Sequence, residues 1–527
     1  MAAYRARSRR QVVPEGAVLH LDMSVPIVEV PPSPLSALLS PQAPLSLRSI
    51  VTALEAAAKD SRVRGVICTF GADTAPPLAV VQELGKGILD FRMAQQDAPE
   101  GVRRFAWVST DTFGEAGQGV GMQQYLLASH FDKVFMQPSG MVGLLGVHQP
   151  TFFYKKLLAK IGIQPQFFKF FEYKNAPNSL TEEGYTDAHR HQSQLLADSI
   201  FEQMTATIAH HRNRSLQQIR ASIDLAPLNA QQALEHGLID AVLYTDQVVS
   251  MVSEDKGREA KTPPATNAGD SRVLEAKPNI VSMRAYIKAT QGGKEDSLLG
   301  SVAGSAQDKK PRIALIHACG NIVRGKGTKN SSEPQAASEK IGAAIRSAYL
   351  DDKVRALVVR VDSRGGSAVA SDSIRRELDK ARALGLPVVV SMGAYAASGG
   401  YYLATAADRI VAQPGTITGS IGAFFGKLNM QALFANLGID VDEIFIGQDA
   451  NFLNPARPLS ESQARKAEAL GRQVYDDFVG HVVASRKLSA EQVDAVARGR
   501  VWTGAQAHSL NLVDQLGGNI IYTMYNV

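Results

Sequence analysis

Two hydrophobic patterns alternate along the chain. Short runs rich in Val, Ile and Leu, such as 63–68 (VRGVIC) and 354–359 (VRALVV), are bounded by polar residues and are typical of buried strands. Each run follows a stretch, 47–59 or 341–350, in which apolar residues recur every three to four positions, as in an amphipathic helix. Helices that alternate with buried strands predict an α/β fold of stacked βα units, with parallel strands under helices.

The same succession of segments occurs twice. The matched pairs are 16–30 with 312–323, 47–59 with 341–350, 63–68 with 354–359, 128–138 with 405–414, 157–163 with 433–439, and 228–240 with 502–514. Six matches in the same order exceed what chance similarity produces, so the chain is predicted to be a tandem duplication.

The repeat fixes the predicted domains. They are a basic N-terminal tail (1–15), an N-terminal repeat domain (16–252), a linker (253–310), a C-terminal repeat domain (311–518) and a C-terminal tail (519–527). The linker is polar and rich in Gly, Ser and charged residues, which is typical of a mobile connection. Within it, 279–290 bears apolar residues and is predicted to be a short ordered island that packs on either half.

Composition narrows the class of protein. The 527 residues carry a formal net charge of +5, and the first ten residues hold Arg5, Arg7, Arg9 and Arg10, which could touch an acidic membrane surface or belong to a frayed terminus. No apolar run approaches the ~20 residues that span a bilayer, and no signal-peptide core follows the arginines. The two cysteines, Cys68 and Cys319, lie in apolar runs. The sequence therefore predicts no integral membrane protein, disulfide framework, metal cluster or nucleic-acid partner.

A candidate nucleophile lies in 391–402 (SMGAYAASGGYY). The run Val388–Val390 predicts a strand, and Ser398 with the two following glycines predicts a tight turn that exposes a hydroxyl beside bare backbone amides. An ordinary glycine-rich turn has the same sequence. The repeat adds information, because the first-half position that matches Ser398 is Met122. The serine is therefore a difference between the copies and not a requirement of the turn.

A second glycine turn follows the strand that ends at Val361. Gly365 and Gly366 precede a helix predicted to begin near Ala370, whereas the first-half counterpart, 71–75, has no such pair. Amides at a helix N-terminus after a buried strand could form an oxyanion hole. A tight strand-to-helix connection explains the glycines equally well.

The base for this serine is either a histidine or a lysine. His317, His481 and His508 lack a local context that favours catalysis. Lys174 lies among aromatic residues, which would desolvate its ammonium group and favour the neutral amine. Its second-half counterpart is Ala450, so each half keeps one of the two groups. Four nearby lysines remain rivals: Lys155, Lys156, Lys160 and Lys169.

Four motifs together resemble the long, duplicated form of the signal peptide peptidase A (protease IV) family. They are 361–367 (VDSRGGS), 392–422 (MGAYAASGGYYLATAADRIVAQPGTITGSIG), 172–176 (EYKNA) and 501–504 (VWTG). The resemblance implies a tandem duplication of a Clp-protease/crotonase-like domain and a cofactor-free, metal-free endopeptidase with a Ser/Lys dyad. It implies Ser398 as nucleophile, Lys174 as base, Ser420 as the lysine's hydrogen-bond partner, and Gly366 and Gly399 as oxyanion-hole amides.

The same resemblance implies further properties. Its substrates would be peptides such as cleaved signal peptides and other extended apolar segments. It also implies a homotetramer, membrane association and a site that faces a cell-envelope or organelle compartment. The sequence departs from the family pattern in three respects. Arg364 replaces the usual proline, the expected N-terminal membrane anchor is not found, and 519–527 fits the family poorly.

Two alternatives to the peptidase stay open. A crotonase-type acyl-CoA enzyme would use the same fold but needs an acidic catalytic residue, for which Asp362 is the local candidate. A catalytically inactive, membrane-associated scaffold would need neither Ser398 nor Lys174.

Overall fold

The computed structural model describes residues 13–31, 43–71, 74–94, 104–115, 120–254, 279–291, 310–328, 331 and 333–518. The predicted tail 519–527, nearly all of the tail 1–15 and most of the linker lie outside these residues. The chain forms two compact units. Unit 1 is built from residues before 147 and between 201 and 310, and unit 2 is built from 147–200 and 311–517.

Unit 1 contains a parallel sheet with the strand order β8-β4-β3-β2-β1-β9. Its elements are β1 (Ala17–Met23), α2 (Leu47–Ala57), β2 (Val63–Phe70), α3 (Leu78–Met93), β3 (Phe105–Thr110), α4 (Gly121–Ala128), β4 (Lys133–Met136), β5 (Met141–Val142), α8 (Leu216–Leu225), β7 (Leu228–Asn229), α9 (Ala230–Glu235), β8 (Ala241–Val242), α10 (Thr245–Glu254), β9 (Ile280–Ser282) and α11 (Met283–Gln291). The island predicted at 279–290 belongs here, because β9 pairs with β1.

Unit 2 contains a sheet with the order β10-β13-β14-β15-β19, in which β16 also pairs with β14 and β18 pairs with β16. Its elements are α5 (Lys155–Lys160), β6 (Gln164–Phe170), α6 (Asn178–Thr181), β10 (Arg312–Cys319), β11 (Asn321–Val323), β12 (Gln335–Ala337), α13 (Ser338–Tyr349), β13 (Val354–Ser363), α14 (Ala368–Ala383), β14 (Val388–Ala397), α15 (Gly399–Ala404), β15 (Arg409–Ala412), β16 (Ile417–Gly419), β17 (Ala423–Asn429), α16 (Gln431–Asn436), α17 (Glu461–Arg486), α18 (Ala490–Val496), β18 (Val501–Thr503), α19 (Gly504–Ser509) and β19 (Gln515–Leu516). Helix α7 (Asp187–His211) contributes residues to both units.

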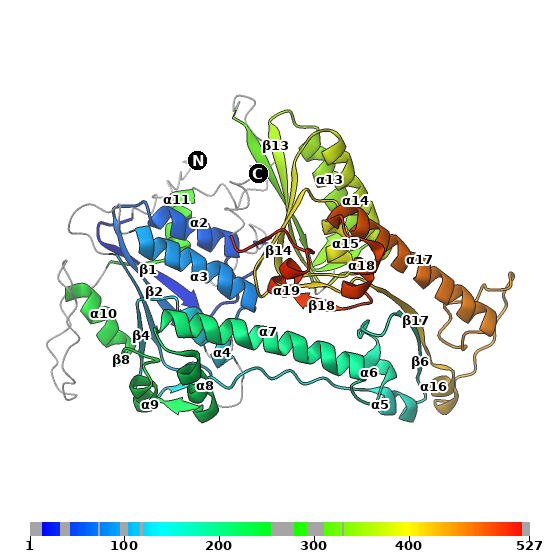
Figure 1. Ribbon diagram of the computed structural model, residues 1–527, viewed down its shortest axis with the longest axis horizontal. Coiled ribbons are helices and arrows are strands. Elements are labelled where there is room, and N and C mark those ends of the chain that lie inside the picture. The colour runs from blue at the N-terminus through cyan, green and yellow to red at the C-terminus, as the bar shows by residue number, and fades with distance from the viewer. Residues whose placement is uncertain are drawn as a thin grey trace, which may run out of the picture. The chain divides into compact units, whose positions relative to one another are not determined.

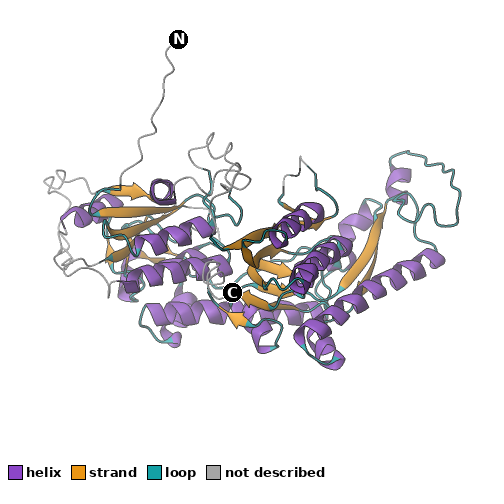
Figure 2. Ribbon diagram, turned by 90° about the horizontal axis from the view of Figure 1, so that it is seen from above, coloured by secondary structure: helices purple, strands orange, loops and turns teal. Residues whose placement is uncertain are grey.

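The two sheets repeat one arrangement. The order β1-β2-β3-β4-β8 in unit 1 corresponds to β10-β13-β14-β15-β19 in unit 2, and every neighbouring pair along both paths is parallel. Figure 2 shows the strands of each unit with helices packed along them. The predicted α/β class with buried parallel strands under helices is confirmed.

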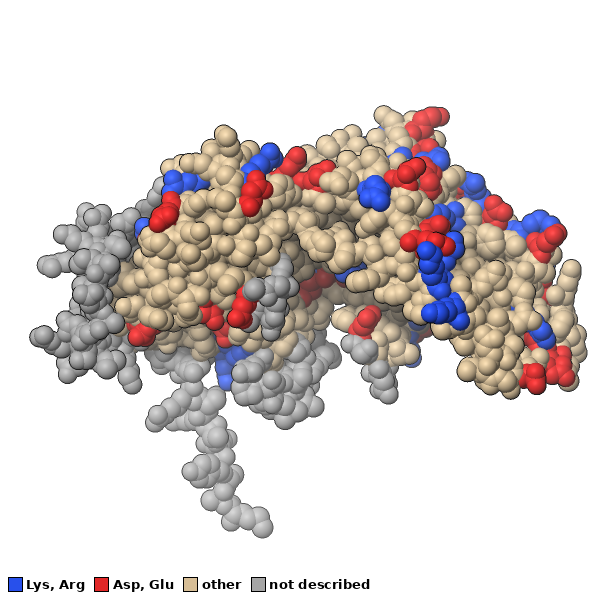
Figure 3. Space-filling view, turned by 90° about the horizontal axis from the view of Figure 1, so that it is seen from below, with Lys and Arg blue, Asp and Glu red and all other residues tan. Residues whose placement is uncertain are grey.

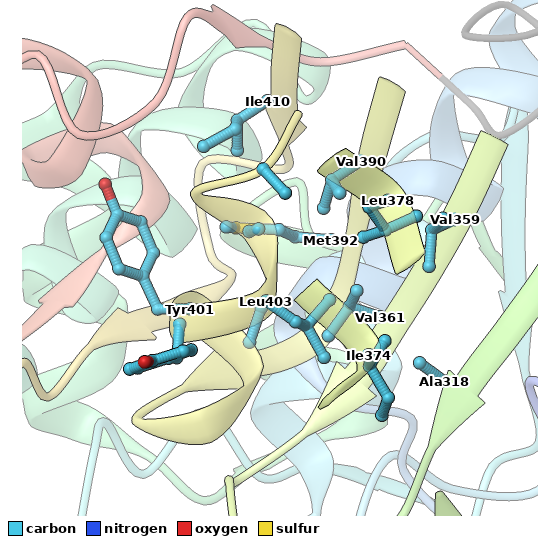
Figure 4. Packing of buried hydrophobic residues seen from close by; sticks show 14 of the residues in the cluster. Ala318, Val359, Val361, Ile374, Leu378, Val390, Met392, Tyr401, Leu403 and Ile410 are labelled. Atoms are coloured by element: carbon cyan, nitrogen blue, oxygen red, sulfur yellow. The ribbon is translucent and has the colours of Figure 1, made fainter. Parts of the chain in front are cut away.

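Helices α14 and α15 cover part of the sheet of unit 2 and form much of its core with it. Figure 4 shows side chains of β13 and β14, such as Val359 and Met392, meeting Ile374 and Leu378 of α14 and Leu403 of α15. These side chains are at most 1% exposed. Burial of these side chains stabilises the fold by roughly 25 cal/mol for each Å² of apolar surface removed from water. The turn between β14 and α15 therefore rests on a rigid core.

An antiparallel pair joins distant parts of the sequence within unit 2. Strand β6 pairs with β17 along its whole length, from Gln164 opposite Asn429 to Phe170 opposite Ala423, and the two strands lie together in Figure 1. By sequence β6 belongs to the first repeat, whereas β17 belongs to the second. The compact units and the sequence repeats are therefore different divisions of the chain, and we retain the repeat boundaries as a proposal.

Charged side chains of both signs share one face of the molecule. On the face drawn in Figure 3, Lys and Arg side chains lie intermixed with Asp and Glu. Among the described residues, no helix is both long enough and apolar enough to cross a membrane.

Candidate active site

Ser398 occupies a strained turn between β14 and α15. Its φ of 53° and ψ of −118° place a non-glycine residue in the left-handed half of the backbone map. A hydrogen bond from its backbone N–H to the carbonyl of Gly419 (2.9 Å) holds the turn against the end of β16. The next residues must be small, because a Cβ on Gly399 would lie 2.5 Å from Ser371 Oγ. The fold thus fixes the direction of the Ser398 hydroxyl.

Lys174 approaches this hydroxyl from the segment that follows β6. Its Nζ lies 3.2 Å from Ser398 Oγ, 2.9 Å from Ser420 Oγ and 2.9 Å from the Ser420 carbonyl oxygen. The lysine comes from the first repeat, yet it lies in the same compact unit as Ser398. The structure therefore brings together three of the residues that the sequence singled out.

The amine of Lys174 is buried, and only 3% of the residue is exposed. Burial lowers the pKa of Lys174 from 10.5 to about 7, because the charged form loses its hydration. A neutral amine has two N–H donors and one lone pair. Two donors match the carbonyl and hydroxyl oxygens of Ser420, which leaves the lone pair to accept the Ser398 hydroxyl proton.

The ladder between β6 and β17 positions the lysine. The ladder ends where Phe170 pairs with Ala423. The segment that follows β6 carries Lys174, and the segment that precedes β17 carries Ser420, so both segments enter the site from the same end of the ladder. The loop after β6 is then clamped, because the Phe171 ring lies 4.4 Å from the guanidinium carbon of Arg498, which also pairs with Glu172 at 2.9 Å. Gly499 packs directly against the backbone of Lys174, since a Cβ at Gly499 would lie 2.4 Å from the backbone nitrogen of Lys174.

The glycine loop after β13 faces the serine. A Cβ on Gly365, whose φ is +109°, would lie 2.8 Å from Ser398 Cβ, so only glycine fits. Strand β11 holds the loop through Ile322, which donates to the Gly365 carbonyl and accepts from the Ser367 amide, each at 2.9 Å. A Cβ built on Gly399 would lie 3.3 Å from the Gly366 nitrogen, so the turns of Gly366 and Gly399 are adjacent. Two amides beside a hydroxyl are the arrangement that an oxyanion hole requires.

An apolar cavity of about 370 Å³ opens beside Ser398. One wall comes from Leu470, Val474 and Phe478 of α17, and another comes from Phe424 and Phe425 of β17. These wall residues were not predicted from the sequence. No local signal in a sequence distinguishes a helix face that lines a cavity from one that packs in a core.

A second cavity of about 600 Å³ shares Ser398, Lys174 and Gly366 with the first. Its lining is different in kind, because it includes the exposed Arg324 and Arg364. Two cavities of different chemistry thus meet at the same hydroxyl.

The other sequence candidates lie elsewhere. His481 lies 3.9 Å from Asp372, whereas His317 lies in β10 and His508 in α19. Asp362 Oδ1 accepts a hydrogen bond from the Tyr395 amide at 2.9 Å, which supports the turn. Among the rival lysines, Lys169 donates to Asn178, and Lys155, Lys156 and Lys160 are exposed. In unit 1, Met122 is buried in α4.

Comparisons with known proteins give matches over most of the chain. A family model described as peptidase family S49 matches residues 116–259 and again 380–520, which confirms the predicted duplication. Protease 4 of Salmonella typhi is 31% identical over 481 residues, covering 90% of this chain and 70% of that protein. Protease 4 of Haemophilus influenzae is 28% identical over 478 residues, covering 90% of this chain and 71% of that protein.

Two further matches complete the comparison. A chloroplastic serine protease SPPA of Arabidopsis thaliana is 31% identical over 399 residues, covering 76% of this chain and 55% of that protein. Among solved structures, a ClpP1 mutant from Listeria monocytogenes matches with a TM-score of 0.27 and 14% identity, covering 42% of this chain and 98% of that chain.

Proposed function

The chain belongs to peptidase family S49, and from this premise we propose that it is a serine endopeptidase in which Ser398 is the nucleophile and Lys174 the general base. One observation carries the proposal. The buried Lys174 amine, with a pKa lowered to about 7, lies 3.2 Å from the Ser398 hydroxyl and within hydrogen-bond distance of Ser420. A neutral amine beside a strained serine is what a Ser/Lys dyad needs.

In the acylation step, Ser398 Oγ bonds to the carbonyl carbon of the peptide while its proton passes to Lys174 Nζ. The negative charge that develops on the carbonyl oxygen is held by the amides of Gly366 and Gly399. When the tetrahedral intermediate collapses, the C–N bond breaks and the leaving amine takes the proton from Lys174. Ser420 keeps the lysine in place through both transfers.

In the deacylation step, Lys174 takes a proton from a water molecule whose oxygen attacks the acyl carbon. The ester bond then breaks, and Ser398 recovers its proton from the lysine. The cycle returns every group to its starting state and consumes one water molecule.

The apolar cavity suggests the substrates. A cavity of about 370 Å³ lined by Phe424, Leu470 and Val474 accepts an aliphatic or aromatic side chain. We propose extended apolar peptides, including cleaved signal peptides, as substrates. Such peptides reside at membranes, so the proposal includes peripheral membrane association.

A fluorophosphonate probe tests the proposed function. The probe is expected to label the intact chain at Ser398, to lose that labelling in Ser398→Ala, and to block cleavage of a fluorogenic apolar peptide. An unlabelled protein that leaves the peptide intact would instead favour the inactive scaffold or the acyl-CoA enzyme, and hydrolysis or hydration of an acyl-CoA would distinguish the latter.

We also propose that the protein assembles with copies of itself. By the register of the repeat, 147–153 corresponds to β17 and 440–446 corresponds to β6. Because β6 and β17 pair as an antiparallel ladder, the two corresponding segments are expected to pair with a strand as well. Neither segment forms a strand in this chain, and Ile444 and Ile446 are 102% and 95% exposed. Pairing 440–446 of one copy with 147–153 of the next reproduces the ladder between chains and places Val147 opposite Ile446. A head-to-tail contact of this kind gives a ring when the rotation between successive chains closes, and the family resemblance suggests a ring of four chains.

Cysteine pairing tests this contact. Chains with Val147→Cys and chains with Ile446→Cys are expected to cross-link when they are assembled together, because opposite residues of a ladder lie within disulfide reach. Each variant alone is expected to stay uncross-linked, and so is a mixture of Val147→Cys with Leu350→Cys, since Leu350 is exposed elsewhere. Equal cross-linking in all mixtures would refute the register.

A further inference from the structure

The second cavity beside Ser398 carries an unbalanced charge. Its lining includes the cations Arg324 and Arg364 besides the Lys174 amine of the proposed dyad, and no Asp or Glu is among its lining residues. Elsewhere, on the face drawn in Figure 3, basic and acidic side chains are intermixed. A concave site lined by one sign of charge raises the local concentration of the opposite charge.

Arg364 is held so that its hydrogen-bond donors stay available. Its guanidinium carbon lies 4.4 Å from the centroid of the Tyr395 ring, which fixes the position of the planar group by a cation–π contact. The ring contact occupies the face of the guanidinium and leaves N–H groups at its edge. A guanidinium fixed in this way loses less freedom when it binds a carboxylate with two parallel hydrogen bonds.

Arg324 is tied to the same loop through the backbone. It directly follows β11, whose Ile322 pairs with Gly365 and Ser367 on either side of the candidate oxyanion amide of Gly366. The Arg364 guanidinium therefore has a fixed position beside the glycine loop, and the backbone that carries Arg324 is fixed to the same loop. A negative charge bound by these two side chains would lie in the cavity that Ser398 also lines.

We propose that Arg324 and Arg364 form a subsite for a carboxylate of the peptide substrate. The subsite lies across the scissile bond from the residue that fills the apolar cavity. This inference rests on the proposed peptidase function and deepens it. The two cavities share Ser398 and Gly366, so an extended peptide with its carbonyl at Ser398 reaches into both. The enzyme then selects a peptide with an apolar residue on one side of the cut and a negative charge on the other.

The carboxylate has two possible sources, and peptide pairs distinguish them. The first series compares Glu with Gln at each of two positions on either side of the cut in an amidated apolar peptide. The second series compares a free C-terminus with an amidated one at the same distances. We expect one series to show about a tenfold preference in kcat/KM for the charged peptide at low salt, and we expect salt to reduce it.

Variants of the enzyme test whether Arg324 and Arg364 cause the preference for the charged peptide. Arg364→Gln and Arg324→Gln are each expected to bring the charged-to-neutral ratio of kcat/KM toward one, whatever they do to the absolute rate. The matched control is Arg355→Gln, which removes an exposed arginine at the opposite end of β13. It is expected to keep the ratio of the parent enzyme.

The outcomes separate this inference from the proposed function. Equal cleavage of charged and neutral peptides by the parent enzyme, or an equal fall of the ratio in Arg355→Gln, overturns the carboxylate subsite and leaves the peptidase standing. Failure to cleave any peptide of either series overturns the proposed function itself.

Discussion

The parallel sheets of unit 1 and unit 2 share one strand order but differ in the turn after the third strand. In unit 2, β14 leads into a turn that holds Ser398 at a φ of 53° before α15 begins. In unit 1, the helix after β3 carries Met122 at the matching position, and its side chain is 2% exposed. A fold of this kind does not need the strained serine. Unit 2 retains it where a lysine and two glycine turns converge, whereas unit 1 has filled the same position with an apolar side chain.

The largest effect is expected from removing the amine that distinguishes the site of unit 2. Lys174→Met replaces it with an apolar chain of similar length and is expected to lower kcat/KM by at least about a thousandfold. In the parent enzyme, the lysine pKa of about 7 predicts that activity rises with pH through about 7. A profile of kcat/KM against pH, measured with a short apolar peptide, tests for this rise. An unchanged profile in Lys174→Met would remove the lysine from the mechanism.

The same variant has an opposite effect on stability. The folded-state pKa of Lys174 lies below its ordinary value of 10.5, so the unfolded chain binds a proton more tightly than the folded chain. The lysine therefore destabilises the fold fully below about pH 7, and the penalty disappears as the pH rises toward 10.5. Lys174→Met is expected to raise the Tm near pH 7 and to converge with the parent protein at high pH.

An intermediate effect is expected at the glycine loop that only unit 2 has. Gly365→Ala places a Cβ 2.8 Å from Ser398 Cβ, and we expect kcat/KM to fall by about tenfold to a hundredfold. Gly385→Ala is the matched control, because its φ is also positive, at +82°, and nothing lies within 4 Å of the added atom. It is expected to lose about 1 kcal/mol of stability and to keep its activity. Equal loss of activity in both would mean that backbone strain alone matters.

The smallest effect on catalysis is expected in unit 1. Met122→Ser gives the first repeat the hydroxyl that it lacks, and we expect no second reactive serine, because the group would be buried in α4. Stability is expected to fall by about 2–4 kcal/mol from lost packing. Probe labelling of the hydroxyl introduced by Met122→Ser, in a Ser398→Ala background, would show that the two units are more alike than their turns indicate.

The sequence predicted much of this arrangement because the duplication provided a register. The strand-to-turn pattern indicated Ser398, and aromatic neighbours indicated Lys174. The offset between the repeats showed that each is absent from the other copy, and the structure places the two side chains 3.2 Å apart. Their chemical roles stay predictions. The α17 wall of the apolar cavity and the antiparallel pair of β6 with β17 were not predicted. Periodicity reports that a strand is half buried and does not say which distant strand it meets.

The β6 and β17 ladder also has a consequence during synthesis. Phe170 pairs with Ala423, so the ribosome adds about 250 residues after completing β6 before its partner exists. At roughly 5–20 residues per second, the strand QPQFFKF waits on the order of ten to fifty seconds with unpaired edges and aromatic side chains. Nascent chains therefore expose an aggregation-prone strand during this interval, and slow translation between the repeats would lengthen it.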